Sequence, residues 1–244
     1  MKRQRRERSM DRETIEMNGG RITLDLIKKD EEIGTYIEYA DKALLALGYT
    51  EHGKAHITTV AARAARIIAL LGKYDEYGIE REAELTAIAG YMHDIGNMVN
   101  RVDHSQSGAI IAFRILERMG MQPPEIAKIV TAIGNHDEGT GVPVSDIAAA
   151  LIIADKTDVR RTRVRNSDNL KFDIHDRVNY SVTRSDFAID RDEREIILSL
   201  TIDTEIGTIM EYFEIFLERM KLCRSAAEAL GATFILEINK QKFT

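Results

Sequence analysis

The chain has 244 residues and a formal net charge of −6, with 34 lysines and arginines against 40 aspartates and glutamates. This balance argues against nucleic acid as a partner, without excluding it, and requires any anionic substrate to be bound by local cations. The single cysteine, Cys223, excludes a disulfide framework and a zinc–thiolate site, and it favours the reducing cytoplasm. No apolar run approaches the roughly 18 residues of a membrane span, so we expect no membrane partner.

The first 20 residues are basic at their start and polar afterwards, without the apolar core of a signal peptide. We expect a disordered tail over 1–20, with a nucleic-acid contact as the alternative reading of its charge. By pattern, the rest of the chain divides into a helical domain over 21–165 and a small α+β domain over 166–244.

Apolar residues recur at helical spacing through the predicted helical domain, and glycines and prolines interrupt them. The expected helices cover 22–29, 33–47, 50–72, 80–92, 104–120, 123–136 and 145–155. Beyond residue 166 the pattern alternates instead, which predicts strands near 178–182, 187–189, 196–202 and 234–238 around a long helix over 204–230. The predicted fold is therefore mainly α, a helical bundle with a β-β-α-β appendage that either forms a small domain or mediates a homodimer.

The most informative stretch is the doublet His93-Asp94, which lies in an otherwise apolar run that ends at Gly96. An unpartnered buried carboxylate costs several kcal/mol, so such an aspartate is usually ion-paired or bound to a metal. Gly96 allows another backbone to approach closely at this point.

Other histidines and an aspartate fall on the inner faces or at the ends of the predicted helices. Each of them alone is more often a hydrogen-bonded core residue or a cap, but together they predict a metal site in the core of an all-α domain. The candidate ligands are His56, His93, Asp94, His104, His136 and Asp155. Nitrogen and oxygen ligands without thiolate suit Fe, Mn, Zn, Co or Ni.

Several polar neighbours of these ligands are candidates for orienting them. His52 precedes His56 by one helical turn and is either a further ligand or a supporting residue, and we favour His56 as the ligand. Asp103 either orients His104 or caps its helix. The remaining residues of this kind, on either side of His136, are Asn135 and Asp137.

The order H…HD…D, formed by His56, His93-Asp94 and Asp155, resembles the HD superfamily of metal-dependent phosphohydrolases over about residues 50–160. The resemblance implies an HD-like helical bundle in which these four residues hold one metal ion. His104 and His136 resemble the extra ligands of the two-metal branch, which includes the HD-GYP phosphodiesterases. Asp94 would then bridge two divalent ions.

The resemblance also implies the chemistry, in which a metal-activated water attacks the phosphorus of a small-molecule phosphoester. Asp94, His93 and Lys156 are then the candidate catalytic residues. Lys156 and Arg160 follow Asp155 and are candidates for binding substrate phosphate. A solvated basic helix end explains both residues equally well.

The chain departs from the two-metal branch at three positions. Asn97 stands where the branch has a lysine that binds phosphate, and it is our remaining substrate-binding candidate. Asn135-His136 replaces a His-His pair, and residues 137–143 are shorter than the GYP signature and lack its tyrosine. The expected substrate is therefore a nucleotide-like or other phosphoester, and not specifically cyclic di-GMP.

Two other functions fit the same residues. Some members of the superfamily use a similar ligand set to hold two irons and oxidise substrates with oxygen. A non-catalytic nucleotide sensor would keep the metal pocket and use the C-terminal domain to bind a partner.

Overall fold

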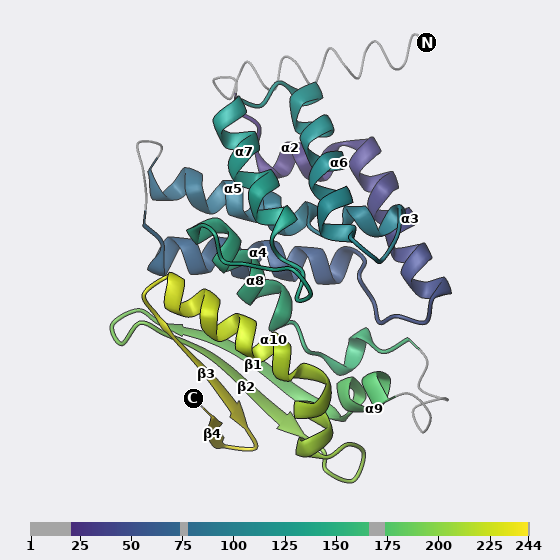
Figure 1. The fold of residues 1–244 in the computed structure, drawn as a ribbon, viewed down its shortest axis with the longest axis vertical. Helices are drawn as coiled ribbons and strands as arrows, with labels where there is room; N and C mark the ends of the chain where they lie inside the picture. The colour runs from purple at the N-terminus through teal and green to yellow at the C-terminus, as the bar shows by residue number, and fades with distance from the viewer. Residues whose placement is uncertain (1–20, 74–77, 166–173, 244) are drawn as a thin grey trace.

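The computed structural model of the protein describes residues 21–73, 78–165 and 174–243, so the expected tail lies outside the described residues. Figure 1 shows a group of helices packed on one side of a small sheet, with helix α10 between them. This is the mainly α fold with an α+β appendage that the sequence predicts. None of the helices in the described ranges is long and apolar enough to cross a membrane.

The helices expected from periodicity over 22–155 are all present, with ends that differ by a few residues. They are α2 (Leu24–Lys29), α3 (Glu31–Ala46), α4 (Lys54–Leu71), α5 (Ile79–Met92), α6 (His104–Met119), α7 (Pro123–Gly134) and α8 (Asp146–Lys156). Side-chain caps begin several of them, as where Ser145 accepts a hydrogen bond from the Ala148 amide at 3.2 Å. Short 3₁₀ turns follow α5 and α8, namely η1 (Ile95–Met98) and η2 (Arg161–Arg163).

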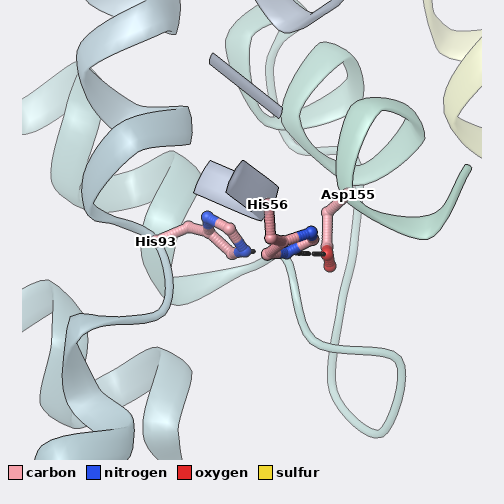
Figure 2. A group of neighbouring side chains, drawn as sticks. All are labelled: His56, His93 and Asp155. Atoms are coloured by element: carbon pink, nitrogen blue, oxygen red, sulfur yellow. Dashed lines mark ion pairs between the residues drawn. The ribbon is translucent and has the colours of Figure 1, made fainter. Parts of the chain in front are cut away.

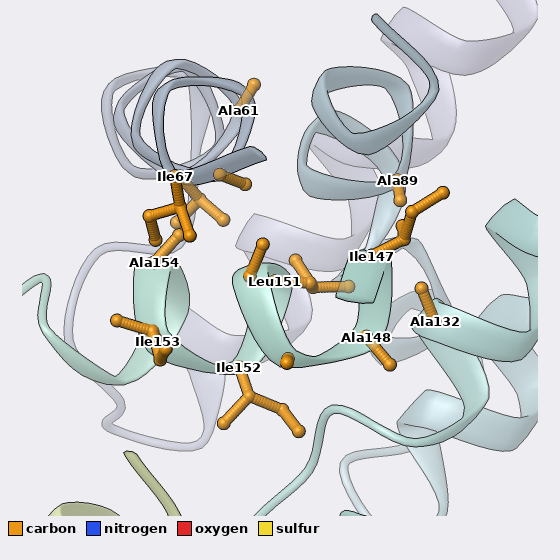
Figure 3. Close-up of a cluster of buried hydrophobic side chains, with 14 of the residues drawn as sticks. Ala61, Ile67, Ala89, Ala132, Ile147, Ala148, Leu151, Ile152, Ile153 and Ala154 are labelled. Carbon is orange, nitrogen blue, oxygen red and sulfur yellow. The ribbon is translucent and has the colours of Figure 1, made fainter. Parts of the chain in front are cut away.

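Helix α8 is the centre of the molecule. Every residue from Ile147 to Ala154 is buried, because α4, α5 and α7 of the helical domain and α10 of the C-terminal unit surround it. Figure 3 shows its apolar side chains pointing outward on all sides into this core. A helix that is apolar all round belongs inside a protein. Its last turn therefore carries Asp155 and Lys156 into the interior.

The C-terminal unit is a four-stranded sheet covered by one long helix. Its elements are α9 (Ile174–Ser181), β1 (Val182–Asp190), β2 (Glu195–Ile202), α10 (Ile209–Ala229), β3 (Thr233–Ile238) and β4 (Gln241–Phe243). The strands lie in sequence order, with antiparallel pairs at both edges and a parallel β2–β3 pair in the middle. Helix α10 makes the crossover that a parallel pair requires. Dimerisation through this unit stays a prediction.

The strand expected near 178–182 is wrong for most of its length. Residues 174–181 form helix α9, and β1 begins only at Val182. Val178 and Tyr180 alternate in sequence, but only Val178 is buried, and Tyr180 instead lies against the guanidinium group of Arg161 at 4.4 Å. The alternation of Val178, Tyr180 and Val182 was too short a pattern to separate a strand from one helical face.

Candidate metal centre

The candidate ligands come from separate helices and meet at one point. His56 lies on α4, His93 and Asp94 follow the last residue of α5, and Asp155 lies in the last turn of α8. His104 is the first residue of α6, and His136 lies two residues after α7. Figure 2 shows His56, His93 and Asp155 pointing toward one another from three different segments.

The first group of atoms contains two imidazoles and two carboxylates. Asp155 Oδ1 lies 3.3 Å from His56 Nε2 and 3.6 Å from His93 Nε2. Asp94 Oδ2 lies 3.3 Å from His93 Nε2 and 3.7 Å from His56 Nε2. Ligand atoms about 2.1 Å from one cation lie about 3.0–3.5 Å from one another. These spacings are close to those of a metal coordination shell.

A second group lies on the other side of Asp94. His104 Nε2 and His136 Nε2 are 3.3 Å apart, and Asp94 Oδ1 is 3.5 Å from His104 Nε2. Asp94 thus turns one oxygen toward His56 and His93, and the other toward His104.

Three atoms at the centre of this cluster have no hydrogen-bond partner among the described residues. They are His56 Nε2, His93 Nε2 and Asp94 Oδ2, and all three are buried. Each buried, unmade hydrogen bond costs about 1–3 kcal/mol, so three of them at one point require an explanation. Two sets of three ligand atoms lie within 4.8 Å of one another, one from His56, His93 and Asp155 and one from His93, Asp94 and His136. The residues present therefore fit a divalent cation.

The far nitrogen of each imidazole is held in place. Three of the four rings donate Nδ1–H to the backbone carbonyl three residues earlier. These bonds run from His93 to Gly90 (2.8 Å), from His104 to Arg101 (3.0 Å) and from His136 to Ile133 (2.6 Å). Since Nδ1 carries a proton in each of these rings, Nε2 is the nitrogen that a metal ion would bind.

Asp158, which the sequence analysis missed, holds the fourth ring. Its Oδ2 lies 2.8 Å from His56 Nδ1, and its two oxygens accept hydrogen bonds from Arg160 at 2.7 and 2.9 Å. Although burial opposes ionisation, the bond from His56 and the charge of Arg163 hold the pKa of Asp158 well below its usual range. The available signal was the place of Asp158 in the sequence, since it follows the end of α8 by two residues and the ligand Asp155 by three.

The charge balance of the metal-free cluster also favours a cation. Burial favours a neutral His93 ring, but the carboxylates of Asp94 and Asp155 outweigh it and raise the pKa of His93 to about 10. Burial likewise opposes ionisation of the two aspartates, whereas His93 and Lys156 keep their pKa values well below the usual range. In the metal-free protein, the ionised carboxylates of Asp94 and Asp155 thus stabilise a proton on His93. A metal ion bound at this point would replace that proton.

Close helix packing positions these groups. Any side chain at Gly90 of α5 would bring its Cβ to 2.9 Å from the Ala61 Cα on α4. The Cβ of a residue other than glycine at position 96 would lie 2.0 Å from the His104 carbonyl oxygen and 2.4 Å from the Gly108 amide nitrogen. The close approach predicted at Gly96 is therefore present, and it sets the distance from His93 to His104.

A family model of the HD domain matches residues 54–161, the segment that contains all of these ligands. The resemblance to the HD superfamily that the ordered ligands indicate is therefore confirmed over this segment.

The chain is similar to one known protein in sequence and to one solved structure. It is 28% identical over 235 residues to Uncharacterized protein MJ1020 of Methanocaldococcus jannaschii, and the matched region covers 88% of this chain and 89% of that protein. A crystal structure of a predicted HD superfamily hydrolase from an uncultured Thermotogales bacterium is 26% identical, with a TM-score of 0.41. That match covers 56% of this chain and 73% of the other.

The cluster of candidate ligands, called the HD site below, opens into a hollow. The empty volume of this hollow is about 290 Å³, which includes open solvent. Its lining residues are all charged or imidazole side chains: His52, Asp94, Arg101, His104, Asp155, Lys156, Arg163 and Arg219. Of these, the sequence analysis did not single out Arg101, Arg163 or Arg219 as site residues. Arg219 reaches the hollow from the C-terminal unit, which no local pattern predicts.

The substrate-binding candidates occupy different places. Lys156 is buried, and its Nζ lies 2.7 Å from Asp155 Oδ2. Asn97 donates hydrogen bonds from Nδ2 to Asp94 Oδ1 and to the Asp94 carbonyl oxygen, both at 2.9 Å, and so fixes the carboxylate between the two groups. Arg160 points to Asp158. Substrate binding by these three residues stays a prediction.

The candidates for orienting residues also differ in position. His52 lies beside the site, with its ring centroid 5.3 Å from that of His56 and its Nδ1 2.7 Å from the Thr50 carbonyl oxygen. Asp137 Oδ1 is 3.9 Å from His104 Nε2 and 4.0 Å from Lys156 Nζ. The structure does not bring the other two to the ligands, because Asp103 is exposed and Asn135 Nδ2 bonds to the Thr131 carbonyl oxygen at 2.9 Å.

Proposed function

We propose that this HD-superfamily protein is a phosphohydrolase that uses bound divalent metal ions to cleave a small-molecule phosphoester. The observation that carries the proposal is the convergence of unpartnered buried ligand atoms at the base of a hollow lined by cations. Imidazole and carboxylate atoms bind the metal, and lysine and arginine bind anionic oxygens.

The orientation of Asp94 supports two metal ions. Its Oδ2 faces His56 and His93, whereas its Oδ1 faces His104, whose Nε2 is itself 3.3 Å from His136 Nε2. His56, His93, Asp94 and Asp155 would hold one ion, and Asp94, His104 and His136 would hold a second. Asn97 holds Asp94 between them.

When bound, divalent ions polarise phosphoryl oxygens and lower the pKa of a coordinated water to near neutrality. The side chains of the chain supply position and charge. Lys156 is held beside Asp155 and lines the hollow, so its ammonium group lies where a phosphoryl group next to the ligands would place its oxygens. Arg101 lies beside His104 and provides a second cation at the opposite group. Both positive charges would stabilise the negative charge that develops in a phosphoryl transition state.

The test is turnover by purified protein whose metal content is known. Protein loaded with manganese, zinc or iron is measured for hydrolysis of phosphomonoesters, phosphodiesters and nucleotides, with metal content determined by elemental analysis. We expect turnover of at least one class, which Asp94→Asn abolishes. Fully metal-loaded protein that cleaves none of these classes would contradict the proposal, and turnover with redox-inactive zinc would separate it from an oxygen-dependent di-iron activity.

A further inference from the structure

Arg219 connects the C-terminal unit to the HD site. It lies on α10, which packs against α8, and it lines the same hollow as Asp94, Asp155 and Lys156. Figure 1 shows α10 passing along α8 where that helix ends. A residue of the appended unit is therefore part of the wall above the candidate metal ligands.

The guanidinium group of Arg219 is held in one orientation. Its Nε and Nη2 donate hydrogen bonds to the two carboxylate oxygens of Glu138 at 2.6 and 3.2 Å, and its Cζ lies 4.9 Å from the centre of the Phe216 ring. Glu138 follows the ligand His136 by two residues, so this pair ties α10 to the site. Among the described residues, no acceptor bonds to Nη1. A cation fixed on two sides with one donor nitrogen left over is preorganised for an anion.

Arg163 is arranged in the same way from the other direction. It is buried, and it donates from Nε to the Glu51 carbonyl oxygen at 2.9 Å and from Nη1 to the Asp158 carbonyl oxygen at 2.8 Å. Within the described part of the chain, nothing accepts a hydrogen bond from its Nη2. Burial lowers the pKa of Arg163, although the charges of Asp158 and Asp155 act in the opposite direction. Arg163 and Arg219 line the same hollow, and each has one donor nitrogen without a described acceptor, which an anion would supply.

The lining of the hollow limits what that anion is. It contains four cationic side chains, Arg101, Lys156, Arg163 and Arg219, against the carboxylates of Asp94 and Asp155. A phosphate above the metal ligands would be served by Lys156 and Arg101, which leaves Arg163 Nη2 and Arg219 Nη1 as donors without a described acceptor. The described residues that line the hollow include no aromatic or aliphatic side chain on which a base would stack.

We infer that Arg163 and Arg219 form a second phosphate subsite, so that the HD site takes a compact substrate with a second phosphate group next to the one that is cleaved. This inference rests on the proposed phosphohydrolase function. It makes Arg219 a specificity-determining residue and Glu138 the residue that positions it. The C-terminal unit then completes the substrate pocket.

The experiment compares anions that carry one, two or three linked phosphates. The full-length protein loaded with manganese is titrated calorimetrically with inorganic phosphate, pyrophosphate and tripolyphosphate, and metal content is measured before and after. We expect pyrophosphate to bind at least tenfold more tightly than phosphate. Arg219→Gln is expected to weaken pyrophosphate binding about tenfold while changing phosphate binding less than twofold. Arg224→Gln, an exposed arginine on the same helix, is the matched control and is expected to change neither.

Two further variants keep the test decisive if Arg219→Gln does not fold. Arg219→Lys keeps the charge but not the fork that pairs with Glu138, and Glu138→Gln keeps the arginine but frees it. Both are expected to weaken pyrophosphate binding by about threefold, with unchanged metal content. Equal binding of phosphate and pyrophosphate, or equal behaviour of the Arg219 and Arg224 variants, would overturn the inference.

Failure of this inference and failure of the proposed function give different results. Protein that binds pyrophosphate through Arg219 but hydrolyses no phosphoester retains the subsite and loses the enzymatic proposal. Protein that hydrolyses a phosphomonoester but binds pyrophosphate equally well with Arg219→Gln and with Arg224→Gln retains the activity and loses the subsite.

Discussion

The helical domain and the C-terminal unit bury different kinds of residue. In the described part of the helical domain, four histidines and several charged side chains are buried together with the aliphatic core. Between residues 182 and 243 of the C-terminal unit, every buried side chain described is apolar or is Cys223. The first core includes groups that burial destabilises, which is expected where a site binds a ligand, and the second serves packing.

A second comparison lies within the helical domain. Arg81 is also buried, but it is fully paired, with two hydrogen bonds to Glu125 at 2.7 and 2.6 Å and one to the Ile22 carbonyl oxygen at 2.9 Å. At the metal centre, by contrast, His56 Nε2, His93 Nε2 and Asp94 Oδ2 have no hydrogen-bond partner among the described residues. Buried charge alone therefore does not mark a functional site, whereas buried ligand atoms that converge without partners do.

The largest expected effect comes from the residue between the two ligand groups. Asp94→Asn keeps the shape of the side chain but removes the charge that both groups share, so we expect metal content to fall to background and turnover to fall at least about 10³-fold. Elemental analysis and a phosphoester assay measure both. Asp192→Asn, in an exposed turn of the C-terminal unit, is the control and should change neither. Normal metal content in Asp94→Asn would show that Asp94 is not a ligand.

The core of the C-terminal unit is expected to affect stability without affecting metal content. Leu198→Ala on β2 removes a fully buried side chain and should lower the free energy of unfolding by about 2–5 kcal/mol. Denaturant unfolding measures this loss, with the exposed Thr201→Ala on the same strand as the control. If folded Leu198→Ala protein lost its metal, the core of the C-terminal unit would contribute to metal binding as well as to packing.

Asp158 tests whether orientation of the ligands matters as well as their identity. Asp158→Asn weakens the bond that fixes the His56 ring, and we expect metal affinity to fall about 10–100-fold while the fold is kept. A competition titration with a metal-binding dye measures the affinity. Asp186→Asn on the exposed face of β1 should leave it unchanged. An effect as large as that of Asp94→Asn would instead identify Asp158 as a ligand.

The smallest expected effect is a pH dependence that separates the metal-free from the metal-loaded protein. The pKa of His93 is raised from 6.5 to about 10, so its protonated form stabilises the metal-free fold fully below about pH 6.5. This contribution is lost as the pH rises through about 10. Metal binding must displace the same proton, so apparent affinity should rise about tenfold per pH unit between pH 7 and 9.

Calorimetry in buffers of different ionisation enthalpy, together with thermal unfolding across this range, measures both parts of that prediction. We expect release of about one proton per metal-binding event from His93, and a metal-free melting temperature that falls toward pH 10. A melting temperature that falls equally in the metal-loaded protein would contradict the assignment to His93.

The sequence by itself predicted most of the local structure of the helical domain. The apolar stripes of α4 to α8 and caps such as Ser145 depend on residues within a few positions of one another, so periodicity located these helices to within a few residues. The pattern near Val178 and Tyr180 was wrong because so short an alternation does not distinguish a strand from a helix. The ligand candidates were found because a histidine or aspartate on an apolar stripe can be seen without knowing what it faces.

Tertiary structure decided which residues meet. His56 and Asp158 are 102 positions apart, and they pair because α4 packs along α8. Arg219 and Glu138 are 81 positions apart, and they meet because α10 covers the end of the same buried helix. Contacts of this kind depend on how helices pack, and side-chain spacing along one helix carries no information about them. The candidate ligands of the HD site could therefore be named from the sequence, whereas the basic wall above them follows only from the packing of α8 against α10.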